Sequence, residues 1–476
     1  MEFDRLVTKD SDLVRGALVV GVVVLLITVL YPKLHHGGEL VNDRKGYELL
    51  WTNAKKRFQL GARGILAAAF EKHKNAFYMV TDNGIEMIVN PKYAHEIRND
   101  ERFSIAAYNE QSFHGTIPGF EIFKQNVVEE RLFINAVRNK LTRSLGWMVV
   151  SASLADQAAE WHSIPLHATI LPIIAQQSSR VFLGEELCHN ANWLRITVNH
   201  TISFFTAVEA MQIQEARNII TPVLETRRAQ RAELLNQGKD PKEFNDLIEW
   251  LEELSGGQSY DPARAQLKIS VAAIHTTSDL LTQTLFNIVG NSKLIEDLRE
   301  EIISTINTYG WQKSAIYNLK LMDSVLKETQ RLKPISIGTM VRVALEDVQL
   351  SDGLEIPKGT KTLVSCHNMW DPDVYDNADE FNGYRFYKLR KLPGQENSAQ
   401  LVSTSANHFG FGHGMHACPG RFFAAAEVKV TLCHILLKYD LRLVGDRPNV
   451  IEHGVAQYAN TWGPLEIKRR KEEISV

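Results

Sequence analysis

The chain is poor in cysteine, and its cysteines show none of the spacings in which they usually cooperate. The four lie far apart and form no C-x-x-C pair; they are Cys188, Cys366, Cys418 and Cys433. A disulfide framework is therefore not expected, because such frameworks are dense in small secreted domains, and no zinc-ligand spacing is present. These absences favour a reducing compartment for most of the chain.

An excess of charge of either sign is also missing. The chain carries 53 basic and 56 acidic residues, for a formal net charge of -3. Nucleic-acid binding needs a basic surface, so the charge balance gives no support for that class of function. A local basic patch could still dock an acidic protein partner.

Long apolar runs are confined to the N-terminus. Gly16 to Tyr31 carries no charge, with Arg15 before it and Lys33 after it. Together with its flanking residues, the run is close in length to the about 20 residues that are needed to span a bilayer. A cleaved signal peptide and a buried core helix are the alternatives. We expect an uncleaved anchor, and this divides the chain into a short tail (1–12), a transmembrane anchor (13–32) and one large domain (40–476).

The large domain shows no clear linker or repeat, and its sequence pattern predicts mostly helices. Helical periodicity dominates residues 130–330 and returns over Arg421 to Lys438. Strand patterns are fewer: a hairpin at residues 78–89, strands at 341–350 and 354–365, and two late strands at 439–444 and 465–468. The pattern predicts a mainly α (α+β) fold with a large helical part and a small β part.

The densest chemical signal is Phe409 to Ala424, FGFGHGMHACPGRFFA. Glycines permit a positive φ and close backbone approach, so this loop could wrap around a flat cofactor. Cys418 precedes a predicted helix, and amides at a helix N-terminus stabilise a thiolate. Such a thiolate can ligate haem iron. The alternative is a buried structural cysteine, which leaves the crowding of glycine, histidine and aromatic residues unexplained.

Two helical segments carry weaker signals. Gln266 to Val289 predicts a largely buried helix that contains the polar triplet His275-Thr276-Thr277. The simplest interpretation is that the threonine hydroxyls bond to carbonyls one turn earlier. In Lys327 to Arg331, Glu328 and Arg331 share one helix face and can pair, as many solvated surface residues do.

The cysteine segment resembles the haem-binding signature of the cytochrome P-450 family, F-x-x-G-x-R/H-x-C-x-G. The match consists of Phe411, Gly414, His416, Cys418 and Gly420. The resemblance implies that Cys418 is the axial thiolate ligand of a haem b iron and that Phe411 packs beside it. It gives His416 the position of a haem-propionate ligand, where many members carry arginine.

The same family's E-x-x-R motif is matched by Glu328 and Arg331. Its third member would be Arg385, although the usual Pro-Glu before it is absent. The resemblance implies a structural network that holds the haem loop. Two arginines also match propionate ligands: Arg138, where the usual tryptophan four residues earlier is Ile134, and Arg342, in the strand after E-x-x-R.

The triplet within Gln266 to Val289 resembles the family's distal motif A/G-G-x-D/E-T-T/S. Thr276 matches the threonine that helps deliver protons to dioxygen. Ala273 replaces the glycine and His275 replaces the acid. Since histidine titrates near neutral pH, His275 could relay protons in the acid's place. These matches imply catalytic roles for Thr276 and His275.

The resemblance covers the chain from about residue 40 to the C-terminus, and the anchor fits a microsomal-type member. Four stretches look like fungal terpenoid-oxidising members, which include ent-kaurene oxidase-like and indole-diterpene-oxidising enzymes; they are AAIHTT, FGFGHGMHACPGR, SRVFLGEELC and KYAHEIRND. This implies a hydrophobic polycyclic substrate of secondary metabolism. We expect its pocket to be lined by residues 103–126, 200–220, 269–276, 336–340 and 457–462.

The implied activity is a monooxygenase that uses dioxygen and electrons from NADPH. The electrons would come through a reductase flavoprotein, with a cytochrome b-type protein as a further donor. The implied location is the endoplasmic reticulum membrane, with a single N-terminal anchor and a cytosolic catalytic domain. Two alternatives remain: a haem-thiolate isomerase or dehydratase that acts on a peroxide without a reductase, and a non-catalytic haem- or lipid-binding membrane protein. The first tends to lose the distal threonine, which is present here as Thr276.

Overall fold

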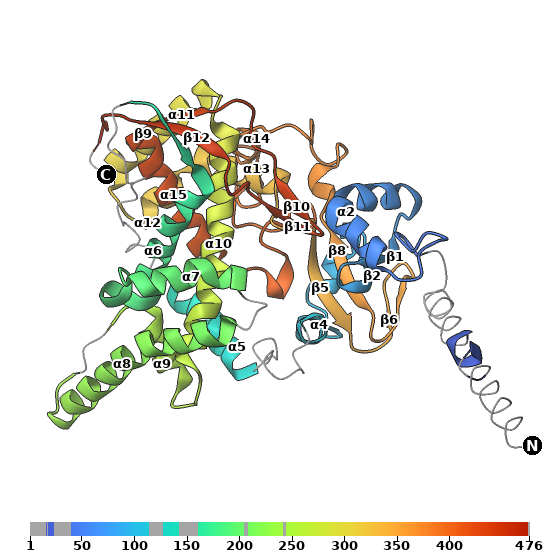
Figure 1. Cartoon of the computed structure of the whole chain (residues 1–476). Helices are drawn as coiled ribbons and strands as arrows, with labels where there is room; N and C mark the ends of the chain where they lie inside the picture. Colours follow the sequence, from blue (N-terminus) through green and yellow to red (C-terminus); the bar gives the residue numbers. More distant parts are fainter. Residues whose placement is uncertain are drawn as a thin grey trace, which may run out of the picture.

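A computed structural model describes residues 16, 18–22, 40–113, 127–141, 160–203, 208–240 and 244–474. Helices form one side of the molecule, and a five-stranded sheet with helix α2 forms the other (Figure 1). Helix α10 runs through the middle of the helical part. This is the mainly α architecture that the sequence predicts, with small sheets beside it.

Most of the described helices lie within the predicted region 130–330 or match the predicted helix at 421–438, whereas the helix at Thr52–Lys72 was not predicted. The described helices are α2 (Thr52–Lys72), α3 (Ala94–Ile97), α4 (Ile105–Ser112), α5 (Val127–Asn135), α6 (Leu166–Leu187), α7 (Ala191–Ser203), α8 (Val208–Asn236), α9 (Leu247–Ser255), α10 (Pro262–Ile288), α11 (Ser292–Tyr309), α12 (Lys313–Asn318), α13 (Lys320–Leu332), α14 (Arg385–Leu389) and α15 (Arg421–Lys438). A π-helical turn, η3 (Ala136–Lys140), continues α5. Helix α10 starts at an Asp261 cap, whose side chain accepts from the amides of Ala263 and Arg264, with Pro262 at its first position.

The five-stranded sheet has the order β1-β2-β8-β5-β3. Its strands are β1 (Ala76–Thr81), β2 (Gly84–Val89), β3 (Phe103–Ser104), β5 (Gly338–Ala344) and β8 (Lys361–Ser365). Strands β1 and β2 form the predicted hairpin, with Thr81 opposite Gly84. The strands predicted over 341–350 and 354–365 are each divided, because β6 (Val348–Gln349) and β7 (Glu355–Ile356) form a separate small hairpin.

The other strands lie in two small sheets beside the helical part. Strand β12 (Pro464–Arg469) pairs with β4 (His162–Pro165) on one side and with β9 (Tyr439–Leu443) on the other. Strands β10 (Ile451–His453) and β11 (Ala456–Tyr458) form a two-stranded hairpin. Strands β9 and β12 correspond to the two late strands predicted from the sequence.

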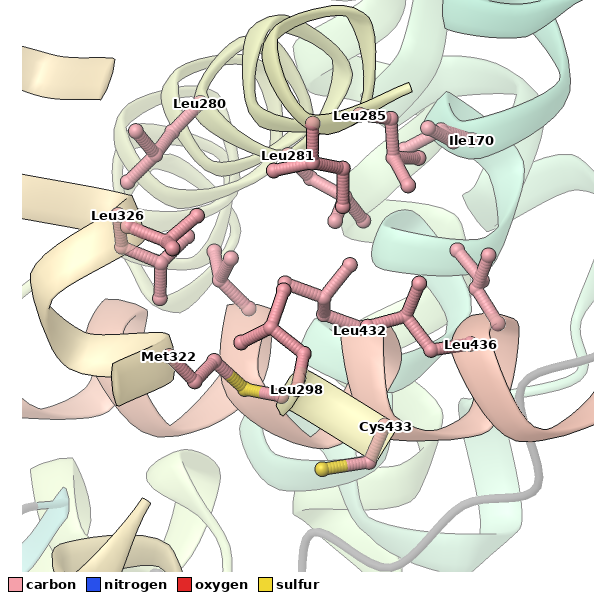
Figure 2. Close-up of a cluster of buried hydrophobic side chains, with 14 of the residues drawn as sticks. Ile170, Leu280, Leu281, Leu285, Leu298, Met322, Leu326, Leu432, Cys433 and Leu436 are labelled. Carbon is pink, nitrogen blue, oxygen red and sulfur yellow. The ribbon is translucent and has the colours of Figure 1, made fainter. Parts of the chain in front are cut away.

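The largest apolar core lies where α6, α10, α11, α13 and α15 meet. Figure 2 shows Leu281 of α10, Leu298 of α11 and Leu432 of α15 pointing toward one another. All three side chains are fully buried. Burying a leucine stabilises the fold by about 1.5–3 kcal/mol, so this core fixes α10 relative to α13 and α15. The site described below depends on that relation.

The expected anchor at 13–32 falls mostly outside the described residues. Of this segment, Gly16 and residues 18–22 are described, and they are helical. In the part of the chain that the structure describes, no helix has both the length and the apolar character needed to cross a bilayer.

Candidate active site

Cys418 lies in the turn between the short helix η7 (Gly414–His416) and α15. Its amide donates to the Phe411 carbonyl oxygen at 2.8 Å, which closes the loop around the sulfur. Burial raises the pKa of the thiol, whereas the backbone N–H groups of Gly420 and Arg421 and the Arg421 charge act to lower it. Two amides and a cation therefore converge on the place where a thiolate charge would develop.

Glycines shape this loop in two different ways. Gly412 and Gly414 have positive φ angles of 69° and 78°, which glycine adopts most easily. A Cβ at Gly414 would also lie 2.4 Å from the Arg98 Cβ. Gly420 has a φ of -88°, which lies outside the left-handed region. Its nearest side chain is Val137, 3.7 Å from where a Cβ would be.

The structure brings together the three residues of the predicted network. Glu328 and Arg331 of α13 are both fully buried, with the Arg331 Nε 2.8 Å from the Glu328 Oε2. Arg385, the first residue of α14, places its Nε 3.0 Å from the Glu328 Oε1. The three residues therefore form a buried network. The i, i+3 spacing of Glu328 and Arg331 alone would also have allowed an exposed pair on the surface.

The arginines then extend the network to the chain before the cysteine loop. Arg331 donates to the carbonyl oxygens of Met369 and Ala378, and Arg385 donates to that of Asp376. Buried backbone carbonyls need such donors, because leaving them unpaired is costly. The network therefore positions residues 369–385, which carry no regular sheet of their own.

Helix α13 also holds the segment leading to Cys418, through residues that the sequence did not single out. The Lys327 Nζ donates to the carbonyl oxygens of Gln400 and Ser403 at 2.7 and 2.8 Å. The Gln330 side chain donates to the Gly410 carbonyl at 3.2 Å, and a Cβ at Gly410 would lie 2.0 Å from the Gln330 Cδ. A side chain at Gly410 would therefore have to displace the Gln330 side chain from the loop.

A cavity of about 390 Å³ lies between the cysteine loop and α10. The loop contributes Phe411, His416, Cys418 and Gly420, and α10 contributes Ile269, Ala272, Ala273, Thr276 and Asp279, among others. The walls also include aromatic side chains from α5, α6 and α15, namely Phe133, Phe182 and Phe423. A largely apolar space therefore separates the thiol from Thr276.

Thr276 faces this cavity, and His275 lies on a different side of α10. The Thr276 hydroxyl donates to the Ala272 carbonyl at 2.7 Å, as the simplest interpretation predicts. Among the described residues that line the cavity, His275 does not appear. It lies instead near His167 of α6, whose pKa falls to about 4 through burial and the His275 charge. The reason is geometric, since successive helix residues point about 100° apart.

The expected pocket segments are confirmed only in part. Residues 269–276 supply several lining side chains. The described residues of 103–113, 211–220, 336–340 and 457–462 are not among the lining residues, although Ile335 is. Residues 114–126 and 204–207 lie outside the described ranges, as do the side chains of 200–203 and 208–210. Apart from the cysteine loop, the remaining lining comes mainly from α5, η3, α6, α13 and α15, which the sequence analysis did not assign to the pocket.

Three basic residues gather at one edge of the cysteine loop. Burial, and then the charges of Arg342 and Arg138, lower the pKa of His416. Arg342 is 2% exposed, and burial lowers its pKa to about 10. The Arg342 guanidinium donates to the neighbouring Val341 carbonyl, and Arg138 donates to the Met415 carbonyl. Among the described residues, neither arginine forms an ion pair with an acid.

These features fit a haem with thiolate ligation. A thiol faces a space with apolar walls, and uncompensated positive charge at its edge suits the two propionate groups of a haem. Burying a guanidinium without a counter-ion is costly, so an anionic ligand there would stabilise the fold. Cys418 would ligate the iron, and Arg138, Arg342 and His416 would bind the propionates.

Comparisons with known proteins agree with this geometry. The model of the family Cytochrome P-450 matches residues 185–468. The cytochrome P-450 monooxygenase esdpI of Penicillium shearii is 68% identical, with 100% of both chains covered. The cytochrome P-450 monooxygenase cle2 of Aspergillus versicolor is 51% identical over 98% of this chain and 95% of its own.

The fold also resembles that of the retinoic acid-bound cyanobacterial CYP120A1. The TM-score is 0.63 at 16% identity, covering 86% of this chain and 95% of that one. At this identity the likeness concerns the fold alone. With relatives this similar over the whole chain, and with a cysteine loop of this geometry, the chain belongs to the cytochrome P-450 family and is a haem-thiolate monooxygenase.

Proposed function

We propose that this enzyme uses dioxygen and NADPH-derived electrons to hydroxylate a hydrophobic terpenoid of secondary metabolism, in one or several rounds. The observation that carries the proposal is the largely apolar wall of α10, with Ile269, Ala272 and Ala273, that faces Cys418 across the space that would hold the haem. Large apolar pockets with few polar groups bind such ligands well. The terpenoid class rests on the four sequence stretches that resemble terpenoid-oxidising members.

When bound, the thiolate-ligated haem supplies the activation of dioxygen. The protein's part is to hold the reactants and to exclude bulk water. The amides of Gly420 and Arg421 stabilise the thiolate, and the basic residues at the edge anchor the propionates. Apolar side chains on the opposite wall position the substrate and keep the site dry, which strengthens every electrostatic interaction inside it.

Thr276 is suited to proton delivery. Its hydroxyl hydrogen is directed at the Ala272 carbonyl, so the oxygen lone pairs remain available to a hydrogen-bond donor in the cavity. A molecule held there lies beside the place where oxygen is reduced. His275, on another side of α10, could act on the cavity only through its neighbours.

For the electron supply we propose an NADPH-dependent reductase flavoprotein, with a cytochrome b-type protein as a second donor. For the location we propose the endoplasmic reticulum membrane, with the anchor at 13–32 and the domain 40–476 in the cytosol. The charge-free N-terminal run supports the anchor. The four cysteines form no disulfide among the described residues, which agrees with a domain in the cytosol. Oxidation of NADPH that depends on both the reductase and the substrate would distinguish a monooxygenase from a reductase-independent isomerase.

A ligand titration of the purified ferric protein tests the substrate class. Polycyclic terpenoids and a fatty acid are added in turn, and the haem absorption spectrum is recorded. We expect a low-spin to high-spin change with the terpenoids, because a ligand that fills the cavity displaces water from the iron. A change with the fatty acid alone would leave the family assignment intact and exclude the terpenoid proposal.

Changing Thr276 to alanine should uncouple electron use from product formation. NADPH oxidation should continue while product falls by about tenfold or more, in the range typical of lost acid–base catalysis, and hydrogen peroxide should rise in step. Thr276→Ser is the matched control, because it keeps the hydroxyl and should keep most of the coupling. Equal coupling in wild type and Thr276→Ala would contradict the proton-delivery role.

A further inference from the structure

Asp279 is an acidic residue inside the cavity that none of the functions above uses. It lies on α10 three residues after Thr276 and lines the same space. Its residue surface is only 7% exposed. Most other cavity walls are apolar or glycine, so a carboxyl group here requires an explanation.

The contacts of Asp279 account for one of its two oxygens. Its Oδ1 accepts a hydrogen bond from the Ala459 backbone amide at 2.6 Å, just after β11. Within the described ranges, no residue bonds to its Oδ2 or forms an ion pair with it. Burial raises the pKa of the carboxyl to about 7, against the lowering effect of the Ala459 amide. Half of the group therefore remains available in a dry site.

A purely structural role explains this arrangement poorly. Satisfying one amide needs one acceptor, which an asparagine would supply without a buried ionisable group. A buried carboxyl with one oxygen unpaired costs free energy, whereas a leucine there would extend the apolar wall. The nearby Thr276 hydroxyl, in contrast, is satisfied within its own helix. Thr277 Oγ1 and Gln330 Oε1 also lack a partner, but among the described lining residues Asp279 is the one that offers a carboxyl oxygen to a ligand.

We propose that Asp279 is a specificity-determining residue that binds a hydroxyl group on an otherwise hydrophobic substrate. The inference rests on the proposed function and deepens it: the preferred substrate is an alcohol, already oxygenated away from the carbon to be attacked. The Ala459 amide fixes the carboxyl, so its free oxygen is preorganised to receive that hydroxyl. The bond would orient the apolar skeleton along the Thr276 face of α10.

A hydroxyl suits this site better than other polar groups. It can donate to the carboxylate form and can accept from the protonated form, so it binds in either state. At a pH above 7, where the Asp279 carboxyl is ionised, a substrate carboxylate would face like charge in a low-dielectric cavity and should be disfavoured. A plain hydrocarbon would leave the carboxyl desolvated and unpaired. The site should therefore rank ligands as alcohol, then hydrocarbon, then carboxylate.

Three ligands with one tricyclic skeleton test this ranking: abietadiene, abietadienol and abietic acid. Dissociation constants are taken from the spin-state change of the full-length ferric protein, so the readout is binding and not turnover. In the wild type the alcohol should bind about tenfold tighter than the hydrocarbon, in line with a hydrogen bond to a charged group. At pH 8, where the Asp279 carboxyl is ionised, abietic acid should bind weakest.

Two variants separate ligand recognition from the anchoring of Ala459. Asp279→Asn keeps an acceptor for the amide and removes the charge, so abietic acid should gain about tenfold in affinity. Asp279→Leu should bring the ratio between alcohol and hydrocarbon close to one. If Asp279→Leu fails to fold, the response of Asp279→Asn to abietic acid still decides the matter.

The outcomes distinguish this inference from the proposed function. An unchanged alcohol preference in Asp279→Leu, or no gain for abietic acid in Asp279→Asn, would overturn the role of Asp279, provided that the protein shows a thiolate-haem spectrum. If none of the three ligands shifts the wild-type spectrum, the terpenoid proposal itself fails. Loss of the haem spectrum in the wild type would overturn the whole assignment.

Discussion

Replacing Cys418 with serine should abolish the absorption spectrum of thiolate-ligated haem and eliminate monooxygenase turnover. The sulfur is the proposed iron ligand, and the surrounding amides and the Arg421 guanidinium are arranged for a thiolate. A serine hydroxyl does not ionise there and ligates iron weakly. An activation barrier that is higher by about 4 kcal/mol already makes the reaction about a thousandfold slower. The measurements are the spectrum of the reduced protein with carbon monoxide and the rate of product formation.

Cys188→Ala is the matched control for this experiment. Cys188 is as buried as a core residue, at 2% exposure, but it lies after α6 and is not among the described residues that line the cavity. Removing its sulfur should cost about 1 kcal/mol of stability and should leave the haem spectrum unchanged. A Cys418→Ser protein that retains the thiolate spectrum would show that another residue ligates the iron.

Changing Glu328 to glutamine should destabilise the protein by about 3–5 kcal/mol, because it leaves two arginines without their carboxylate. Glu328 and Arg331 are fully buried, so water cannot replace the lost interaction. Arg331 and Arg385 would also lose the alignment with which they hold the carbonyls of residues 369–378. Haem content should fall with stability, because this network positions the segment that leads to Cys418.

Urea unfolding and haem-to-protein ratio measure the effect of Glu328→Gln. Lys293→Ala provides the control, because it removes an exposed i, i+4 ion pair with Asp297 on α11. Exposed pairs contribute little, so its unfolding midpoint should stay where it is. A Glu328→Gln protein with a wild-type midpoint and full haem content would show that the network does not support the loop.

Local patterns in the sequence were sufficient to predict several structural features. The hairpin of β1 and β2 depends on the Asp82-Asn83-Gly84 turn between alternating residues, and α15 occupies the predicted Arg421–Lys438. The cysteine segment could be recognised because its residues must be close in sequence to form one loop. The pairing of Glu328 with Arg331 follows from their separation by three positions on a helix.

Contacts between distant segments could not be predicted in this way. The sequence shows that Glu328 and Arg331 can pair, but their complete burial depends on the core between α10, α11, α13 and α15. The bond of Gln330 to Gly410 and that of Asp279 to Ala459 join residues 80 and 180 positions apart. No local pattern indicates such partners.

The sequence by itself determined the chemistry of this protein, and the tertiary structure decided which polar residues reach that chemistry. A short motif specifies a thiolate loop, since its ligand, glycines and helix start are consecutive. The orientation of α10 is set by packing around Leu281 and its neighbours, and it turns Thr276 and Asp279 toward the cavity and His275 away from it. Helix rotation is fixed by the apolar side chains that it buries, and these belong to many distant segments.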